Sequence, residues 1–356
     1  MALHYITKEK FGNFLEELEK NYSVFIPVKK GDHRFYTRFG FLKQPETSAV
    51  KTTGSEVVIG EVRTSEPLKL FFFKSRERVA EGFNDEIPIT DKKPYCIVGA
   101  KACDLKGFKV QDRVFKENDY QDPFYIKRRE ENLVISADCT CAIETCYCLS
   151  LHLNPYPEEN FDINLSEING GYVVESGSDR GEEILRKNSS LFSEANPTQL
   201  SQRDEQRKRV VREVRQNIKE NKIPDQDSFK GIIEKNYNDP VWKEEAEECV
   251  ECGACNMICP TCHCFLLYDQ KNAESIARLR VWDSCMIKDF AKVAGGANPR
   301  PQLWMRLRNR FEKKFDFFPK ISDIYACTGC GRCISACPAK IDIRNVLRRL
   351  VENVQK

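Results

Sequence analysis

The chain has 356 residues, enough for two or three domains and at least one sizeable core. Hydrophobic residues make up 41% and charged residues 31%, and the net charge of +2 provides no general attraction to nucleic acid or to an anionic membrane. No apolar run comes near the roughly 18 residues that span a bilayer, and the first ten residues lack the apolar stretch of a secretory signal. These features predict a cytoplasmic protein.

Residues 1–190 are predicted to form an α/β domain. Apolar residues at helical spacing between 11 and 18, preceded by Thr7 as a candidate N-cap, predict a helix over 8–22. Short runs rich in β-branched and aromatic residues predict strands at 24–26, 57–59, 70–73, 96–98, 133–135 and 172–174. Leu105, Phe108 and Phe115 indicate a helix between the strands near 97 and 134, which makes one βαβ unit.

Residues 191–245 are predicted to be a charged helical connector, and residues 246–356 a helical, ferredoxin-like domain. Over 203–222, eight Lys/Arg and four Asp/Glu accompany a thin apolar stripe that includes Val210 and Val214. This pattern predicts a solvated helix that lies across another surface, and the favoured interpretation of its role is a charged connector with no binding role. An amphipathic helix that starts near Ile343 closes the chain, so the overall class is α+β.

Seventeen cysteines are unusual for a chain of this composition. Eleven lie between Cys249 and Cys337, and four more lie between Cys139 and Cys148. In a reducing cytosol such crowding indicates metal ligands before it indicates disulfides.

A cysteine motif with a proline at its end occurs twice in the last hundred residues. Both copies read Cys-x-x-Cys-x-x-Cys-x-x-x-Cys-Pro, the form that holds two [4Fe–4S] clusters, and the fourth cysteine of each copy binds the other cluster. The predicted ligands are therefore Cys249, Cys252, Cys255 and Cys337 for one cluster, and Cys327, Cys330, Cys333 and Cys259 for the other. Gly253, Gly329 and Gly331 provide the permissive backbone that such tight loops need.

Zinc is the other metal that Cys-x-x-Cys pairs commonly bind. A structural zinc site, however, needs only four ligands and has no use for a doubled run of cysteines. The copies are separated by 67 residues that are rich in Arg and Lys, which favours a helical ferredoxin domain over the small β-rich type. This basic stretch either compensates anionic clusters, docks a partner or is simply solvated.

A third [4Fe–4S] cluster is predicted in the N-terminal part. Cys103 and Cys139 each follow a strand of the βαβ unit, so the parallel strands deliver both residues to one sheet edge. Cys146 and Cys148 lie in the loop just beyond, and Cys141 is an alternative to Cys139. Unligated or zinc-bound thiols are the other interpretations. Cys96 lies inside an apolar strand and is expected to be a core residue.

Cys262, Cys264 and Cys285 remain. They form a further metal site, completed by His263 or by a partner residue, or a redox-active thiol group, or they are ordinary buried cysteines.

The chain resembles the family that contains the iron–sulfur β subunits of cytoplasmic sulfhydrogenases and the corresponding iron–sulfur subunits of anaerobic sulfite reductases. The resemblance runs over most of the chain, in order, and its most specific segments are Cys259-Pro260-Thr261-Cys262-His263-Cys264 and Trp282-Asp283-Ser284-Cys285. Ala102-Cys103-Asp104 and Cys330-Gly331-Arg332-Cys333 also match. Lys101-Ala102, where the family usually has Arg or His, and the additional Cys141 depart from it.

This resemblance implies an electron-transfer subunit between a flavoprotein that handles NAD(P)H and a catalytic hydrogenase or reductase subunit. We found no Gly-x-Gly-x-x-Gly or P-loop motif, as expected of a relay without its own nucleotide site. The alternative is a catalytic subunit that reduces thiols or sulfur at Cys262, Cys264 and Cys285, and a zinc-stabilised scaffold is a third possibility.

Overall fold

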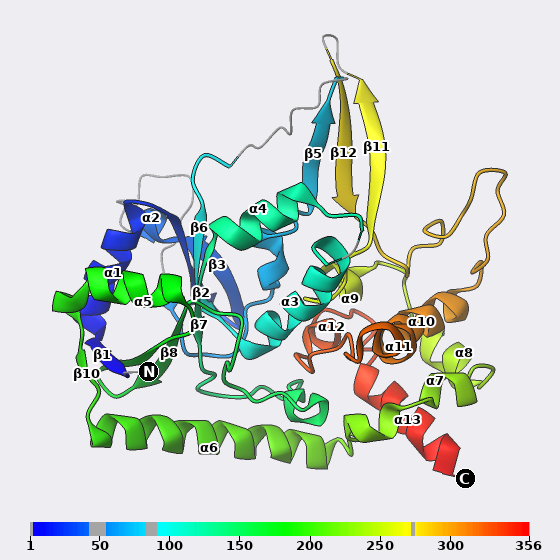
Figure 1. Ribbon diagram of the computed structural model, residues 1–356. Coiled ribbons are helices and arrows are strands. Elements are labelled where there is room, and N and C mark those ends of the chain that lie inside the picture. Colours follow the sequence, from blue (N-terminus) through cyan, green and yellow to red (C-terminus); the bar gives the residue numbers. More distant parts are fainter. Residues whose placement is uncertain (1–2, 43–54, 83–90, 118, 272–274, 356) are drawn as a thin grey trace.

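The computed structural model describes residues 3–42, 55–82, 91–117, 119–271 and 275–355 (Figure 1). The strands are β1 (His4–Thr7), β2 (Ser23–Lys30), β3 (His33–Arg38), β4 (Glu56–Val57), β5 (Arg76–Glu81), β6 (Tyr95–Ala100), β7 (Leu133–Ala137), β8 (Ile163–Ile168), β9 (Gly171–Ser176), β10 (Ser193–Glu194), β11 (Phe265–Lys271) and β12 (Ile276–Trp282).

The α-helices are α1 (Lys8–Glu19), α2 (Phe39–Leu42), α3 (Ala102–Phe115), α4 (Pro123–Glu131), α5 (Asp179–Lys187), α6 (Pro197–Glu220), α7 (Ile232–Lys235), α8 (Val241–Ala246), α9 (Ala254–Met257), α10 (Leu303–Glu312), α11 (Phe318–Ser322), α12 (Arg332–Ser335) and α13 (Ile343–Gln355). The remaining helical turns are η1 (Leu68–Phe71), η2 (Cys148–Leu151), η3 (Ser189–Leu191), η4 (Gln226–Phe229) and η5 (Lys313–Phe317).

A mixed sheet forms the centre of the N-terminal part. Its strand order is β10-β1-β9-β8-β7-β6-β2-β3, with β4 paired to β2. The neighbours β2–β6, β6–β7 and β7–β8 are parallel. The unit β6–α3–α4–β7 confirms the predicted βαβ unit, and it carries the carboxyl ends of β6 and β7 to the same edge of the sheet.

Successive side chains of the central strands point to opposite faces of the sheet, and both sets are apolar. Both faces therefore need helices to cover them. Cys96 and Val98 of β6 belong to the core beneath α1, whereas Ile97 packs with Phe72 and Phe108 on the other face. Cys96 is fully buried, as expected of a core residue. Thr7 accepts a hydrogen bond from the Lys10 N–H, so the predicted N-cap of α1 is confirmed.

Two predicted strands differ in the structure. Residues 70–73 do not form a strand, since Leu68–Phe71 is the helical turn η1, anchored where the Leu68 N–H donates to the Asp104 carboxylate. Phe72 and Phe73 are fully buried against the face that carries α3. The predicted strand at 57–59 overlaps the two-residue strand β4 only at Val57. Apolar content alone did not distinguish a buried turn from a buried strand.

The predicted connector contains a 24-residue helix, α6, which runs along one side of the molecule (Figure 1). It begins at a capping box between Asn196 and Gln199. Val210 and Val214 are at most 1% exposed and pack against the loop that contains Cys139, Cys141, Cys146 and Cys148. The predicted helix is therefore present, and its apolar stripe lies across the surface of the N-terminal cysteine region.

The insertion between the two cysteine motifs is not wholly helical, which corrects the expected helical ferredoxin domain. Its first half forms the hairpin β11–β12, and β12 pairs with β5 of the N-terminal part in an antiparallel three-stranded sheet. Figure 1 shows this sheet projecting from the body of the molecule. Arg280 of β12 is buried and pairs with Glu77 and Asp122, so ion pairs tie the hairpin to the N-terminal part.

The C-terminal helices surround a second core. Trp242, Phe311, Val346 and Leu350 are fully buried there, together with Tyr147 from the N-terminal cysteine loop. The face of α13 was predicted from its apolar spacing. Among the described residues, no helix is both long enough and apolar enough to cross a membrane.

Candidate metal centres

Five cysteines of the N-terminal part line one cavity, which we call the N-terminal cavity. They are Cys103, Cys139, Cys141, Cys146 and Cys148, and Cys330 of the second ferredoxin motif lines the same cavity. Val210 and Val214 of α6 close one side of it. The four cysteines predicted to hold a third cluster are thus brought together, and the alternative residue Cys141 lies with them.

The sheet explains how these residues meet. Cys103 lies in the first turn of α3, directly after β6, and Cys139 lies two residues after β7. The Cys139 N–H donates to the Pro155 carbonyl at 2.9 Å, which fixes the loop beyond β7. The Tyr147 N–H donates to the Gly329 carbonyl at 2.9 Å, which joins this loop to the second ferredoxin motif.

Buried cations lie beside the N-terminal cavity. Arg63 is 6% exposed, lines the cavity and donates hydrogen bonds to Ser335 and to the Cys330 carbonyl. Lys101, the position that departs from the family pattern, is 2% exposed and donates to the carbonyls of Ile59 and Asp138. These cations suit a site in which several thiolates gather.

Burial makes the uncharged thiols the favoured form when no metal is bound. It raises the pKa of Cys139 to about 12 and holds the pKa values of Cys103 and Cys148 well above the ordinary value of a thiol. A metal that binds sulfur removes the proton and supplies the balancing positive charge. The donor set therefore fits a metal–sulfur centre better than a group of free thiolates.

The loops of the two ferredoxin motifs share one backbone geometry. Gly253 and Gly331 have φ values of +71° and +70°, and each immediately precedes a one-turn helix, α9 or α12. Gly329 (φ +64°) lies so close to the N-terminal loop that a Cβ atom would lie 2.6 Å from Cys148 Cα. Glycine is needed here for its positive φ and for the close approach of the two chains.

Cys249, Cys252, Cys255 and Cys337 line a second cavity, which we call the C-terminal cavity. Cys333 and Arg310 also line it, with Leu307 and Ile343 from α10 and α13. The Ile341 N–H donates a hydrogen bond to Cys337 Sγ, with 3.3 Å between nitrogen and sulfur. Cys252 is exposed, so this cavity lies near the surface. The four cysteines predicted for one cluster are therefore brought together.

The other four predicted ligands, Cys259, Cys327, Cys330 and Cys333, form what we call the middle set. Burial raises the pKa of Cys333 to about 12, against the lowering effect of Arg310 and together with smaller contributions from the thiols of Cys330, Cys327 and Cys259. Tyr147 Oη lies 3.3 Å from Cys327 Sγ, and Lys314 Nζ lies 3.3 Å from Cys259 Sγ. These contacts to sulfur come from side chains that the motif did not identify.

A further cavity, which we call the tri-cysteine cavity, is lined by Cys262, Cys264 and Cys285. His263, Asp283 and Asn256 lie in its wall with Arg310, Lys313 and Lys314. Part of the basic stretch between the motifs is therefore buried beside cysteines. By contrast, Arg278 forms an exposed pair with Asp269.

The spacing of the sulfur atoms separates an iron–sulfur cluster from a single zinc ion. Four thiolates about 2.3 Å from one zinc ion lie about 3.8 Å from each other. In the part of the chain that the structure describes, which includes every cysteine, no three cysteine sulfurs lie within 4.8 Å of one another. Cysteines that converge on cavities at this wider spacing fit a multi-iron cluster.

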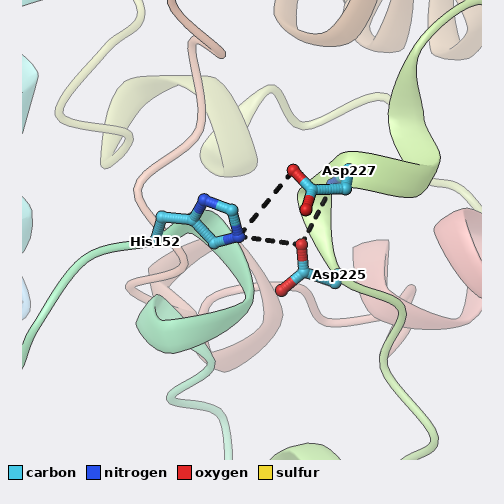
Figure 2. Close-up of side chains that lie close together, drawn as sticks. All are labelled: His152, Asp225 and Asp227. Atoms are coloured by element: carbon cyan, nitrogen blue, oxygen red, sulfur yellow. Dashed lines mark hydrogen bonds and ion pairs between the residues drawn. The ribbon is translucent and has the colours of Figure 1, made fainter.

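One group of possible metal ligands does have all its ligand atoms within 4.8 Å of one another, but it contains no cysteine. It consists of His152, Asp225 and Asp227, all exposed (Figure 2). His152 Nε2 lies 2.8 Å from an Asp225 oxygen, and the same oxygen accepts the N–H of Asp227 at the start of η4. The group is accounted for as a surface ion pair that caps a helical turn.

Sequence reasoning did not assign a role to three residues that lie near the sulfurs, Arg63, Tyr147 and Asn256, although Asn256 lies inside the first ferredoxin motif. Arg310 and Lys314 belong to the basic stretch for which compensation of anionic clusters was one of the interpretations. The clustering of Arg and Lys between the motifs was the available signal for the last two. For Tyr147, its place between Cys146 and Cys148 was the only signal.

Comparison with known proteins agrees with this geometry. Residues 248–341 match the family model described as a 4Fe-4S dicluster domain. The chain is 30% identical over 348 residues to "Sulfhydrogenase 2 subunit beta" of Pyrococcus furiosus, and the match covers 97% of each protein. It is also 30% identical to "Pyruvate-flavodoxin oxidoreductase" of Trichormus variabilis over 101 residues, which are 28% of this chain and 6% of that protein.

Proposed function

Since the chain belongs to the family of sulfhydrogenase beta subunits, we propose that it relays electrons between two other subunits of a cytoplasmic oxidoreductase. The family and the dicluster domain support an iron–sulfur electron-transfer role within a multi-subunit complex. We assign one end of the relay to a flavoprotein that handles NAD(P)H, and the other end to a catalytic hydrogenase or reductase subunit. The many cysteines suit a reducing compartment.

The residues proposed to hold three [4Fe–4S] clusters are the middle set and the predicted cysteines of the two cavities on either side. Each cluster bound there would accept and release one electron. Tyr147, Lys314 and Arg63 would hold charge and hydrogen bonds close to the sulfurs or to their loops, and such groups tune cluster potentials.

One observation carries the proposal: the middle set reaches both cavities. Cys330 lines the N-terminal cavity, and Cys333, three residues later, lines the C-terminal cavity. The three predicted sites therefore form a continuous series, from the N-terminal cavity through the middle set to the C-terminal cavity. A series of adjacent redox sites is what a relay requires.

Both ends of this series lie close to the surface. At the C-terminal end, Cys252 is exposed. At the N-terminal end, Asn154 lines both the N-terminal cavity and an open groove of about 580 Å³ on the outer face of α6. Lys208, Arg212 and Arg215 line this groove, and none of the three forms an ion pair with the described residues. We assign this basic groove to the docking of an acidic partner surface.

The relay is tested by removing one of its members in the native complex. Cys148→Ala should remove about four irons per chain. It should abolish electron transfer from NAD(P)H to the terminal acceptor, while viologen-driven partial reactions of the two partner subunits persist. Cys96→Ala, which changes a core cysteine away from the cavities, is the control and should retain the overall reaction. An unchanged overall rate after loss of the cluster would contradict the relay.

The alternative, a thiol- or sulfur-reducing subunit that works through free Cys262, Cys264 and Cys285, has less support. Such chemistry needs accessible thiols. Cys285 is only 4% exposed, and Cys262 and Cys264 are only partly exposed.

A further inference from the structure

The three cysteines of the tri-cysteine cavity come from two separate segments. Cys262 and Cys264 follow the first ferredoxin motif, and Cys285 follows β12. The Asp283 N–H donates to the Cys264 carbonyl at 2.9 Å, which holds the two segments together. The cavity has the same volume as the N-terminal cavity, about 30 Å³ in each case. The fold has thus formed a cysteine-lined cavity in addition to the N-terminal and C-terminal cavities.

The side-chain amide of Asn256 contacts two of these three sulfurs. Asn256 is 3% exposed; its Nδ2 donates to Cys285 Sγ at 3.1 Å, and its Oδ1 accepts from the Cys262 thiol at 3.6 Å. Arg310 Nε donates to the same Oδ1 at 3.0 Å, which fixes the orientation of the amide. An N–H donor fixed beside a cysteine sulfur stabilises a thiolate that ligates iron.

The charge around the cavity also indicates an anionic occupant. Arg310, Lys313 and Lys314 line it, and Lys313 Nζ lies 3.9 Å from Cys264 Sγ. Arg310 is 5% exposed, and its Nη2 is buried without a hydrogen-bond partner among the described residues. A buried guanidinium nitrogen without a partner is costly, and an anionic group in the adjacent space would offset that cost.

Several simpler explanations fit these observations poorly. The three sulfurs do not all lie within 4.8 Å of one another in the described structure, which is too wide for a single metal ion. Ordinary core cysteines would pack against apolar side chains, whereas these face arginine, lysine and asparagine. A cluster with several irons satisfies both the spacing and the charge.

We propose that Cys262, Cys264 and Cys285 hold a fourth iron–sulfur cluster, in which one iron has a ligand other than cysteine. No further cysteine lines the cavity. His263 and Asp283 are the other lining residues able to bind iron, and His263 Nδ1 donates to the Thr261 carbonyl at 3.0 Å, leaving Nε2 as the acceptor nitrogen. Arg310 lines both this cavity and the C-terminal cavity, so the cluster lies beside the proposed relay.

The test is an iron count on the full chain, with its clusters assembled under anaerobic conditions. The unmodified protein should contain about 16 irons and 16 acid-labile sulfides, and Cys285→Ala and Cys264→Ala should each contain about 12. The dithionite-reduced EPR signal of each variant should lose the contribution of one cluster. Cys96→Ala, which removes a thiol from the sheet core, should retain about 16 irons.

Iron content that does not change in Cys264→Ala and Cys285→Ala would overturn the proposal. Mössbauer spectra of the unmodified, iron-57-labelled protein provide a count that depends on no substitution: four clusters support the proposal and three overturn it. The relay has a separate test in the native complex, where Cys148→Ala interrupts electron transfer. A chain with three clusters that still relays electrons would therefore refute the fourth cluster alone.

Discussion

At the scale of single residues, the N-terminal loop and the second ferredoxin motif are joined by buried polar contacts. Arg332 and Asp104 form an ion pair at 2.8 Å, with side chains at most 1% exposed. Arg332 lies between Cys330 and Cys333, and Asp104 follows Cys103. Breaking one partner of such a buried pair is expensive because the other charge remains buried. This pair therefore fixes cysteines of two sites relative to each other.

Two glycines with matching backbone conformations provide a test of this close packing. Gly331 (φ +70°) and Gly231 (φ +71°) each precede a one-turn helix, but a Cβ atom on Gly331 would overlap the Thr145 carbonyl, whereas one on Gly231 meets nothing within 4 Å. Gly231→Ala should cost only the strain of a left-handed alanine, about 1–2 kcal/mol. Gly331→Ala should additionally push the two loops apart and lower the iron content. Iron analysis and denaturant unfolding of both variants check this, and equal iron contents would contradict it.

At the scale of elements, α6 has two faces of different character. Its inner face buries Val210 and Val214 over the N-terminal cavity, and its outer face carries the basic groove. A helix with this many charges would be marginal in isolation, so its stability comes from the inner face. The sequence of α6 shows an apolar stripe and a basic face, but it does not show which parts of the molecule they contact.

The inner face of α6 is tested by a pair of asparagine substitutions. Val214→Asn places an amide against the N-terminal cavity, where it has few partners, and should lower stability by about 1–3 kcal/mol and release the iron held there. Val211→Asn, on the partly exposed side of the same helix, should leave the iron content unchanged. Equal losses of iron in both variants, measured after anaerobic purification, would show that α6 does not close this cavity.

At the scale of the whole molecule, the N- and C-terminal parts meet at the cysteine-lined cavities. Cys249, Cys255, Cys327 and Cys333 all contact the C-terminal core, which also contains Tyr147 from the N-terminal loop. Metal that binds such residues stabilises the fold, because the unfolded chain offers no preformed site.

Removal of iron should therefore destabilise much of the chain. Chelation under anaerobic, reducing conditions should lower the thermal midpoint measured by circular dichroism and weaken near-ultraviolet signals from buried aromatic residues such as Trp242 and Tyr147. Protein kept under the same conditions without chelator is the control. An unchanged midpoint in iron-free protein would mean that the apolar cores alone stabilise the fold.

The sequence alone determined which residues could hold metal, because ligand type and spacing are local properties of the chain. The doubled motif, the βαβ unit and the helices α1, α6 and α13 were all predictable from short-range patterns. Only the tertiary structure placed Cys330 and Cys333 at different cavities, covered one cavity with α6 and joined β12 to β5. These arrangements join segments such as those of Arg63 and Cys330, which are 267 residues apart in the sequence, and no local spacing rule encodes such distances.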